Sequence, residues 1–222
     1  MRDIHCHILP GVDDGARTLE ESLQMLQAAK DAGITSIVCT PHCRSPYFDF
    51  DKKWDAFHQL KSKANGFPLQ MGFEVNIAKL KRLGLEWADR LHFEDSDEFL
   101  LELEDEANEI DFREYNRIIY ELQGKGYRII IAHPERYKAI QKNPDLAIDL
   151  MRCGCKLQAS ADFLNGGRAL SFSGGKIKKT AVKLFDDMCY SFIASDAHNV
   201  KHYEAFKKAV NSFDVRGAHA AL

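Results

Sequence analysis

The sequence feature that most constrains the fold is a regular alternation of short apolar runs with longer amphipathic stretches. The run Ile34–Thr40 is followed by a helical pattern over Asp51–Ala64, and Tyr127–Ala132 by one over Pro144–Arg152. Such alternation is typical of βαβ units and of a parallel sheet. About seven strands can be counted, which predicts an α/β fold, a distorted barrel one β/α unit short of the eight-fold form. We expect one domain, 1–222.

The first unit illustrates the pattern. A short strand is expected over Asp3–His7, and Thr18 with Glu21 forms a predicted capping box for the next helix. Gly33 is placed to end that helix. Further strands are expected over Leu69–Glu74, Phe99–Leu103, Lys156–Ala159 and Tyr190–Ala194, and further helices over Phe112–Gln123 (closed by Gly124), Lys176–Asp187 and Tyr203–Phe213.

Composition excludes several classes of protein. The net charge of -3 gives no broad basic field for nucleic acid. The N-terminus has no apolar signal region, and no apolar run is long enough for a membrane span. None of the six cysteines forms a C-x-x-C pair, so we expect reduced thiols and a cytoplasmic protein without membrane insertion.

Histidines and carboxylates occur where the predicted strands end. In parallel β/α proteins these ends share one face, and functional sites form there. His5 and His7 have the spacing that places two strand side chains on the same side, and Asp196 and His198 repeat it. The other residues in such positions are His42, Glu74, Glu102 and His133. The remaining histidines lie on predicted helices or loops and are interpreted as ordinary polar residues: His58, His92, His202 and His219.

Imidazole and carboxylate ligands without thiolates suit manganese, iron or zinc. The number of candidate ligands predicts roughly two or three divalent ions. Clustered divalent ions suit phosphoryl chemistry, because they neutralise phosphate oxygens and activate water. The sequence therefore predicts a metal site at the C-terminal ends of the strands.

Longer motifs around these residues resemble a known superfamily. They are Asp3–Ala16 (DIHCHILPGVDDGA), Thr40-Pro41-His42, Gly72-Phe73-Glu74, Ala132–Tyr137 (AHPERY) and Ser195–Asn199 (SDAHN). The chain resembles the PHP (polymerase and histidinol phosphatase) superfamily over nearly its whole length. Within it, the adjacent aspartates and AHPERY are most similar to the manganese-dependent protein-tyrosine phosphatases of bacterial capsule and exopolysaccharide operons, the CpsB/YwqE type.

The resemblance implies a ligand set and a reaction. His5, His7 and Asp196, with Glu74 or Glu102 bridging, would hold one metal; Glu74, Glu102 and His133 a second; and Asp14, His42 and His198 a third. Arg136 matches the family arginine that binds the substrate phosphate, with a surface ion pair as the alternative. Asp196 or His198 would relay a proton. The implied substrate is phosphotyrosine on an autophosphorylated bacterial tyrosine kinase. The oligomeric state is not indicated.

The chain departs from the family pattern in three places. After Asn199 the usual second arginine is missing, and Lys201 offers only a point charge. Residues Asn165–Gly175 are rich in glycine and serine, and the C-terminal segment after Phe213 is short. These departures bear on substrate preference rather than on the metal ligands.

Several alternatives stay open. No cysteine is followed by arginine at the C-x5-R spacing, which excludes the cysteine phosphatase mechanism. Histidinol phosphate or another small phosphoester is an alternative substrate, and a non-catalytic metal-binding regulatory module an alternative role. A polymerase-associated nuclease is disfavoured because there is no basic excess. Glu104 is a spare ligand, and Tyr47, Phe48 and Phe50 either stack on a substrate ring or pack their loop.

Overall fold

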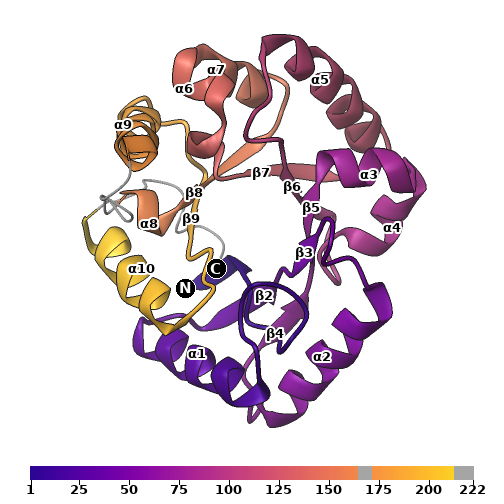
Figure 1. The fold of residues 1–222 in the computed structure, drawn as a ribbon, viewed down its shortest axis with the longest axis vertical. Coiled ribbons are helices and arrows are strands. Elements are labelled where there is room, and N and C mark those ends of the chain that lie inside the picture. The colour runs from indigo at the N-terminus through magenta and orange to yellow at the C-terminus, as the bar shows by residue number, and fades with distance from the viewer. Residues whose placement is uncertain (165–171, 213–222) are drawn as a thin grey trace.

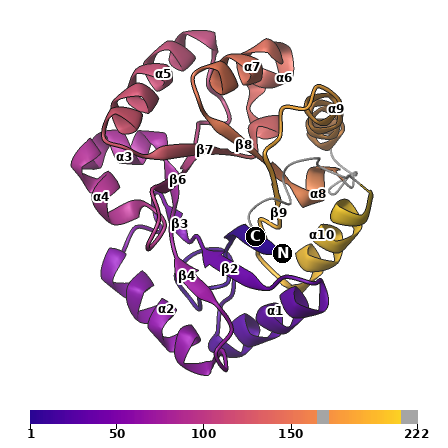
Figure 2. The ribbon, with the colours of Figure 1, turned by 180° about the vertical axis from the view of Figure 1, so that it is seen from behind.

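The computed structural model describes residues 1–164 and 172–212 of an α/β protein whose strands all pair in parallel. Figures 1 and 2 show helices around the outside of a ring of strands. The strands are β1 Arg2–Cys6, β2 Ser36–Cys39, β3 His42–Cys43, β4 Leu69–Met71, β5 Glu74–Asn76, β6 Glu98–Glu102, β7 Arg128–Ala132, β8 Lys156–Ser160 and β9 Phe192–Ala194.

The helices mostly follow the strands, as the alternation predicts. They are α1 Leu19–Asp31, α2 Phe50–Lys63, α3 Ile77–Leu83, α4 Ala88–Leu91, α5 Glu109–Gly124, α6 Lys138–Lys142, α7 Asp145–Arg152, α8 Ala161–Leu164, α9 Phe172–Asp186 and α10 Val200–Ser212, with short 3-10 turns η1 Leu85–Trp87 and η2 Pro134–Arg136. Part of the segment Asn165–Gly175, rich in glycine and serine, and the tail from Phe213 lie outside the described residues.

The strands form two sheets. One has the order β1-β2-β4 and the other β3-β5-β6-β7-β8-β9. Breaks fall between β2 and β3 and between β4 and β5. The first follows the predicted strand Ile34–Thr40, which contains β2 alone, and the second divides the predicted strand Leu69–Glu74. Glu74 opens β5 instead of ending a strand. Pro41, which has no N–H to donate, stands at the first break. Gly72 stands at the second, where a Cβ would lie 2.5 Å from the Phe93 ring.

The edges of the two sheets meet at the first and last strands. Cys6 forms a β-bridge with Ala197, and the Asp196 N–H donates to the His5 carbonyl at 2.9 Å. Buried Asp3 accepts hydrogen bonds from the Ser195 N–H and from its hydroxyl. These bonds fix the segment after β9 against β1, so candidate ligands almost two hundred residues apart become neighbours.

Two apolar clusters fill the interior. The larger lies between strands and helices and includes most of the buried aliphatic residues. The smaller brings together Phe93, from the loop before β6, and side chains from the strands themselves, namely Ile4, Val38, Leu100, Ile130, Ala132 and Ala194. Its members on β6 and β7 come just before the candidate ligands Glu102 and His133 in the chain. This packed apolar layer gives those ligands a rigid support.

Local signals at helix ends are confirmed in part. The Thr18 hydroxyl accepts a hydrogen bond from the Glu21 N–H at 3.2 Å. The Glu21 carboxylate, however, accepts from the Arg17 N–H, so the predicted capping box is only half formed. Gly33 follows α1 with φ +87°, as predicted. The prediction that Gly124 closes α5 is wrong, because Gly124 is helical and the left-handed residue is Gly126.

Candidate metal centre

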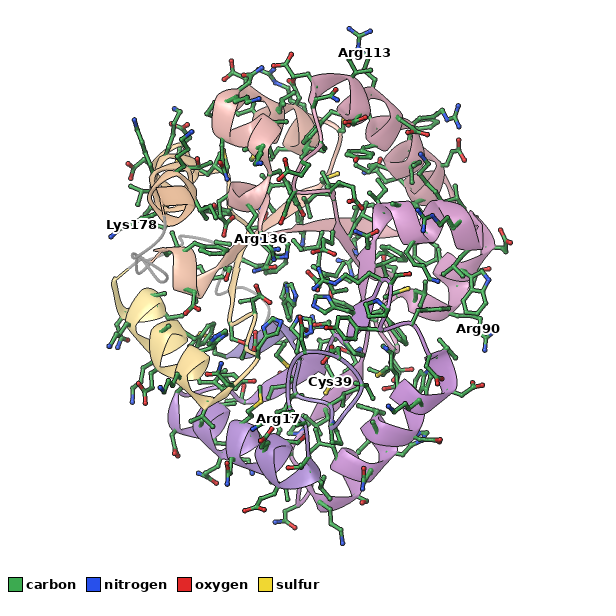
Figure 3. The ribbon with its side chains drawn as sticks, in the orientation of Figure 1. Arg17, Cys39, Arg90, Arg113, Arg136 and Lys178 are labelled. Atoms are coloured by element: carbon green, nitrogen blue, oxygen red, sulfur yellow. The ribbon has the colours of Figure 1, made fainter. Side chains whose placement is uncertain are left out.

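The strand ends bring all the predicted ligands together. Ligand atoms fall into four groups, each with members within 4.8 Å of one another: His5, His7 and Asp196; His5, Glu74 and His133; His42, Glu74 and Glu102; and His7, Asp14, His42 and His198. The grouping differs from the predicted one in pairing Glu102 with His42 and His5 with His133. In Figure 3, side chains with nitrogen and oxygen atoms gather inside the ring of strands.

His5 and His7 are oriented so that their Nε2 atoms face each other. His5 Nδ1 lies 2.8 Å from the Gln158 Oε1, and His7 Nδ1 lies 2.9 Å from Asp13 Oδ2. Both partners are pure acceptors, so each Nδ1 carries a proton and each Nε2 points into the cluster, where it can bind a cation as a lone pair or carry a second proton. The two Nε2 atoms are 3.3 Å apart. Two nitrogens about 2.1 Å from one ion have roughly that separation.

The charges around these rings favour a cation. Burial alone would lower the pKa of His5, but the charges of Glu74 and Asp196 outweigh it and raise the pKa to about 9. Burial likewise opposes ionisation of Asp13, yet the His7 ring lowers the pKa of that carboxyl to about 2. Facing lone pairs and buried carboxylates therefore require positive charge between them, either a proton or a metal ion.

Glu74 lies at the centre of the cluster. Its Oε1 is 2.8 Å from His133 Nε2 and its Oε2 is 2.5 Å from His42 Nδ1. Oε2 and His42 Nδ1 are nevertheless both buried without a hydrogen bond, as is His133 Nδ1. Buried polar atoms rarely lack partners. These buried atoms without hydrogen bonds lie in two of the candidate ligand groups, and Glu74 belongs to both.

Two candidate ligands have strained backbones. His133 has φ 30° and Asp196 has φ 48°. Residues other than glycine rarely adopt this left-handed region, and such strain of about 1–3 kcal/mol concentrates at functional sites. Here it turns the chain at the ends of β7 and β9. The surrounding hydrogen bonds, including the one from the Asp196 N–H to His5, hold the strained positions.

Arg44, which the sequence did not single out, enters the outer group. Its Nη2 lies 2.9 Å from His42 Nε2 and 3.5 Å from Asp14 Oδ2, and its Nη1 lies 3.4 Å from Glu102 Oε1. Burial and the charge of Glu74 raise the pKa of Glu102 to about 7. Arg44 donates to the same His42 lone pair that a metal in this group would use, so the two cations compete there.

Arg136 lies at the edge of the cluster, toward the centre of the ring in Figure 3. Its Nη1 is 3.4 Å from His133 Nε2, and its Nη2 makes an ion pair with Asp105 at 3.1 Å. Glu135 is not its partner: that buried carboxylate accepts from the Ser160 N–H and the Tyr190 hydroxyl. Arg136 and Arg44 both line a cavity of about 630 Å³ that opens from the cluster.

Other sequence interpretations have mixed outcomes. Glu104 accepts from Asn76 at 2.8 Å instead of joining a ligand group. Phe48 and Phe50 pack on Trp87 and Phe73, whereas Tyr47 stacks beside His42 with ring centroids 5.9 Å apart. His202, interpreted as an ordinary polar residue, lines the cavity at the cluster. Lys201 lines a different cavity, next to Arg17, so it does not replace the missing arginine there.

The residues that sequence reasoning missed are those behind the ligands. Gln158 and Asp13 fix the two imidazoles, and Asp3 fixes the loop of Asp196. Only Asp13 had a signal, as the first of two adjacent aspartates. Cys43, next to the candidate ligand His42, is not suited to act as a nucleophile. Burial raises the pKa of its thiol to about 12, which disfavours the thiolate. Within the described residues, no helix is long and apolar enough to cross a membrane.

The chain is similar to known proteins over most of its length. The chain is 36% identical over 206 residues to a putative tyrosine-protein phosphatase CapC of Staphylococcus aureus, covering 90% of this chain and 78% of that protein. It is 34% identical over 207 residues to the tyrosine-protein phosphatase YwqE of Bacillus subtilis, with the same shares covered. A crystal structure from work on YwqE and on CpsB of Streptococcus pneumoniae, described as metal-dependent tyrosine phosphatases, superposes with a TM-score of 0.79 and 31% identity.

That superposition covers 96% of this chain and 87% of the crystallised one. The family model for capsular polysaccharide synthesis proteins CpsB/CapC matches residues 1–214. The chain therefore belongs to the CpsB/CapC family of capsular polysaccharide synthesis proteins.

Proposed function

We propose that this protein is a metal-dependent phosphatase that hydrolyses phosphotyrosine on proteins, most naturally on a bacterial tyrosine kinase that controls capsule or exopolysaccharide synthesis. The relatives named as tyrosine-protein phosphatases support the activity. The observation that carries the proposal is the paired Nε2 atoms of His5 and His7, which face Asp196 and Glu74 at 3.4–3.5 Å. A buried cluster of imidazole nitrogens and carboxylates that can bind divalent cations suits phosphoryl transfer.

The residues present fit two or three divalent ions, with manganese preferred and iron or zinc as alternatives. His5, His7 and Asp196 would hold one ion, and His133, Glu102 and His42 would share others with the bridging Glu74. Asp14 and His198 complete the outer group. When bound, such ions neutralise phosphate oxygens and make water nucleophilic near neutral pH. In this proposal residues 1–222 form one distorted barrel of about seven β/α units with the ions at its C-terminal mouth.

Arg136 and Arg44 would receive the substrate phosphate. Both guanidinium groups line the cavity beside the cluster, and their forked donors match phosphate oxygens. Arg44 would thereby supply the second guanidinium that the segment after Asn199 lacks. Asp105 holds Arg136 in place through its ion pair. The two arginines would stabilise the charge on the phosphate as the bond to the tyrosine oxygen breaks.

Asp196 and His198 would handle the proton. Asp196 Oδ1 lies 3.7 Å from His198 Nδ1, and His198 Nε2 lies 3.4 Å from Asp14 Oδ1. His198 is a quarter exposed, whereas His5 and His7 are fully buried, so it is the histidine that reaches both cluster and solvent. Its Nδ1 lies 2.9 Å from the Asp196 carbonyl, which orients the ring, so it would pass a proton to the leaving tyrosinate from Nε2 and only when that nitrogen holds no ion.

A direct test compares three substrates: a phosphotyrosine peptide, histidinol phosphate and p-nitrophenyl phosphate, each with added manganese and with a chelator. We expect turnover of the peptide that the chelator stops. Arg136→Ala should raise KM for the peptide by about 10- to 100-fold while the metal content, measured by elemental analysis, stays the same. Preferred turnover of histidinol phosphate would overturn the protein substrate, and metal binding without any turnover would favour a regulatory module.

A further inference from the structure

A second cavity, lined mainly by lysines, lies on the other side of the wall that carries Arg136. It has a volume of about 430 Å³ and lies between α6 and α9, with Lys138, Lys142, Lys176, Lys179 and Lys183 around it. We call it the lysine groove. Gln141 and Thr180 complete its polar lining. For a chain with a net charge of -3, this is a marked local concentration of positive charge.

Three of these lysines have no ion-pair partner within residues 1–164 and 172–212. Lys138 pairs with Glu106 at 2.6 Å and Lys183 with Asp187 at 2.9 Å. No acidic side chain of the described residues forms an ion pair with Lys142, Lys176 or Lys179, and all three are exposed. The groove thus keeps a positive charge that its own surroundings do not neutralise.

The groove borders the cavity of the metal cluster. Arg136 lines that cavity and Lys138 lines the groove. One residue, Tyr137, separates them, so their Cα atoms are at most about 7.6 Å apart. On α9, Ile177 lines the metal cavity and the adjacent Lys176 lines the groove. The Gln141 side chain donates to the carbonyls of Glu135 and Arg136, which fixes one wall to the other.

We infer that the lysine groove binds an anionic stretch of the substrate polypeptide next to the phosphotyrosine. This inference rests on the proposed function and adds a substrate class to it: a phosphotyrosine flanked on one side by acidic side chains or by a second phosphate. An extended chain advances about 3.3 Å per residue, so the anionic groups belong roughly two to five residues from the reacting tyrosine.

The charge pattern favours this occupant over a neutral one. Lysine ammonium groups are flexible point charges that suit several carboxylates or phosphates, without the fixed fork that arginine offers at the reacting phosphate. Each exposed ion pair contributes little, so affinity would come from the three unpaired lysines together and would weaken as salt is added.

The test measures KM and kcat for phosphotyrosine peptides that differ only in their flanks. One peptide is neutral, one has three glutamates before the tyrosine and one has them after it. We expect one acidic peptide to have a KM about 5- to 20-fold lower than the neutral one, with kcat unchanged. A further peptide with a second phosphotyrosine in the favoured flank should gain more, because phosphate carries more charge than a carboxylate.

Variants assign that gain to the groove. The triple variant Lys142→Ala, Lys176→Ala and Lys179→Ala should lose it while hydrolysing the neutral peptide and p-nitrophenyl phosphate normally. Lys178→Ala is the matched control, since Lys178 is on the same helix but does not line the groove, and it is labelled on the outer side of α9 in Figure 3. It should keep the full preference.

Two results would overturn the inference: equal KM values for acidic and neutral peptides, or a triple variant that keeps the preference. Failure of the proposed function looks different, because p-nitrophenyl phosphate would then be hydrolysed and the neutral phosphopeptide would not. In that case, fluorescence anisotropy with the labelled acidic phosphopeptide still tests the groove. Equal binding to the wild-type protein and the triple variant would count against it.

Discussion

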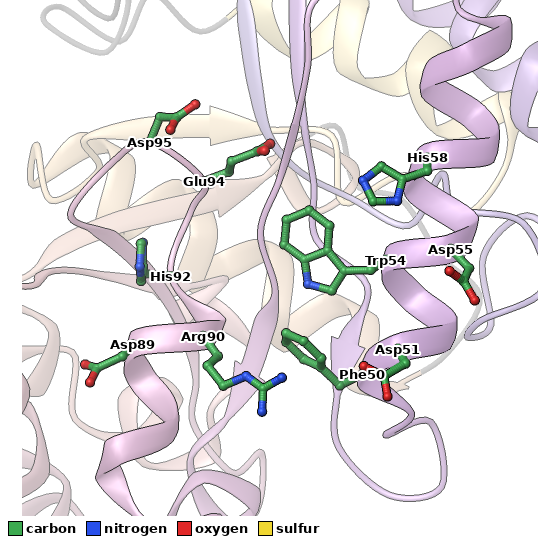
Figure 4. Close-up of a pocket in the computed structure, with 10 residues that line it drawn as sticks. All are labelled: Phe50, Asp51, Trp54, Asp55, His58, Asp89, Arg90, His92, Glu94 and Asp95. Atoms are coloured by element: carbon green, nitrogen blue, oxygen red, sulfur yellow. The ribbon is translucent and has the colours of Figure 1, made fainter.

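Two regions of the molecule contain the same kinds of side chain but have different organisation. The metal cluster holds histidines, aspartates and glutamates inside the ring of strands. A groove of about 740 Å³ between α2 and α4, which we call the acidic groove, is lined by Phe50, Asp51, Trp54, Asp55, His58, Asp89, Arg90, His92, Glu94 and Asp95. Figure 4 shows these side chains spread along the groove walls.

The difference lies in convergence and burial. Among the described residues, no three donors of the acidic groove come within 4.8 Å of one another. His92 Nδ1 lies 2.8 Å from the carbonyls of Phe93 and Ser96, and Arg90 covers the Phe50 ring at 4.3 Å. His92 and Arg90 in the acidic groove thus make local contacts of their own. A metal site needs several buried donors aimed at one point, which residue type alone does not provide.

The largest expected effect comes from changing one carboxylate in each region and comparing the two variants. Glu74→Gln removes the central charge of the cluster and should lower kcat by on the order of 10³-fold or more, with loss of bound metal. Glu94→Gln in the acidic groove should change kcat less than about two-fold. Metal analysis and phosphopeptide turnover check both.

Glu74→Gln should also destabilise the metal-free protein, by up to about 3–5 kcal/mol, because it leaves the buried rings of His5 and His42 without their carboxylate partner. Thermal unfolding with chelator controls for this. An active, metal-loaded Glu74→Gln protein would contradict the bridging role of Glu74.

A smaller effect on metal affinity is expected from a residue that contacts the candidate ligands without belonging to a ligand group. Asp13 holds the His7 ring and also accepts from the His42 N–H at 3.1 Å. Asp13→Asn leaves the shape but allows the other tautomer of His7, and should weaken metal affinity by about 10- to 100-fold. Titration with manganese, followed by activity, measures this. Asp55→Asn, an exposed carboxylate of the acidic groove, is the matched control, and an equal affinity in both variants would refute the orienting role.

How much the sequence could predict follows from the same contrast. Ligands such as His133 and Asp196 end apolar runs, so their convergence followed from parallel topology alone. The break between β4 and β5 at Gly72 could not be predicted from the sequence, because it depends on the Phe93 ring, which packs there from a distant segment. Arg44 and Gln158 gave no signal for a similar reason: each acts through a contact between strands that are far apart in the chain.

The helical histidines show where residue position was sufficient. His58 and His92 were assigned no metal role because they lie off the strand ends, and the described ligand groups do not include them. His202 received the same interpretation from the same rule, yet it lines the cavity at the cluster. Its Nδ1 is 3.1 Å from the Asp196 carbonyl, since the turn into α10 brings it back to the site. A rule based on strand ends cannot detect a residue that returns on the next helix.

The smallest effects should come from the acidic groove itself. Trp54 packs against Phe57 with ring centroids 5.7 Å apart, so Trp54→Ala should lower the free energy of unfolding by about 2 kcal/mol. His58 is exposed on the same helix, so His58→Ala should lower the free energy of unfolding by less than about 0.5 kcal/mol. Neither variant should change metal content or kcat at a temperature where both are folded, as urea unfolding and metal analysis would show. Loss of bound metal in His58→Ala would mean that the exposed, separated donors of the acidic groove can hold an ion. The distinction between the two regions would then fail.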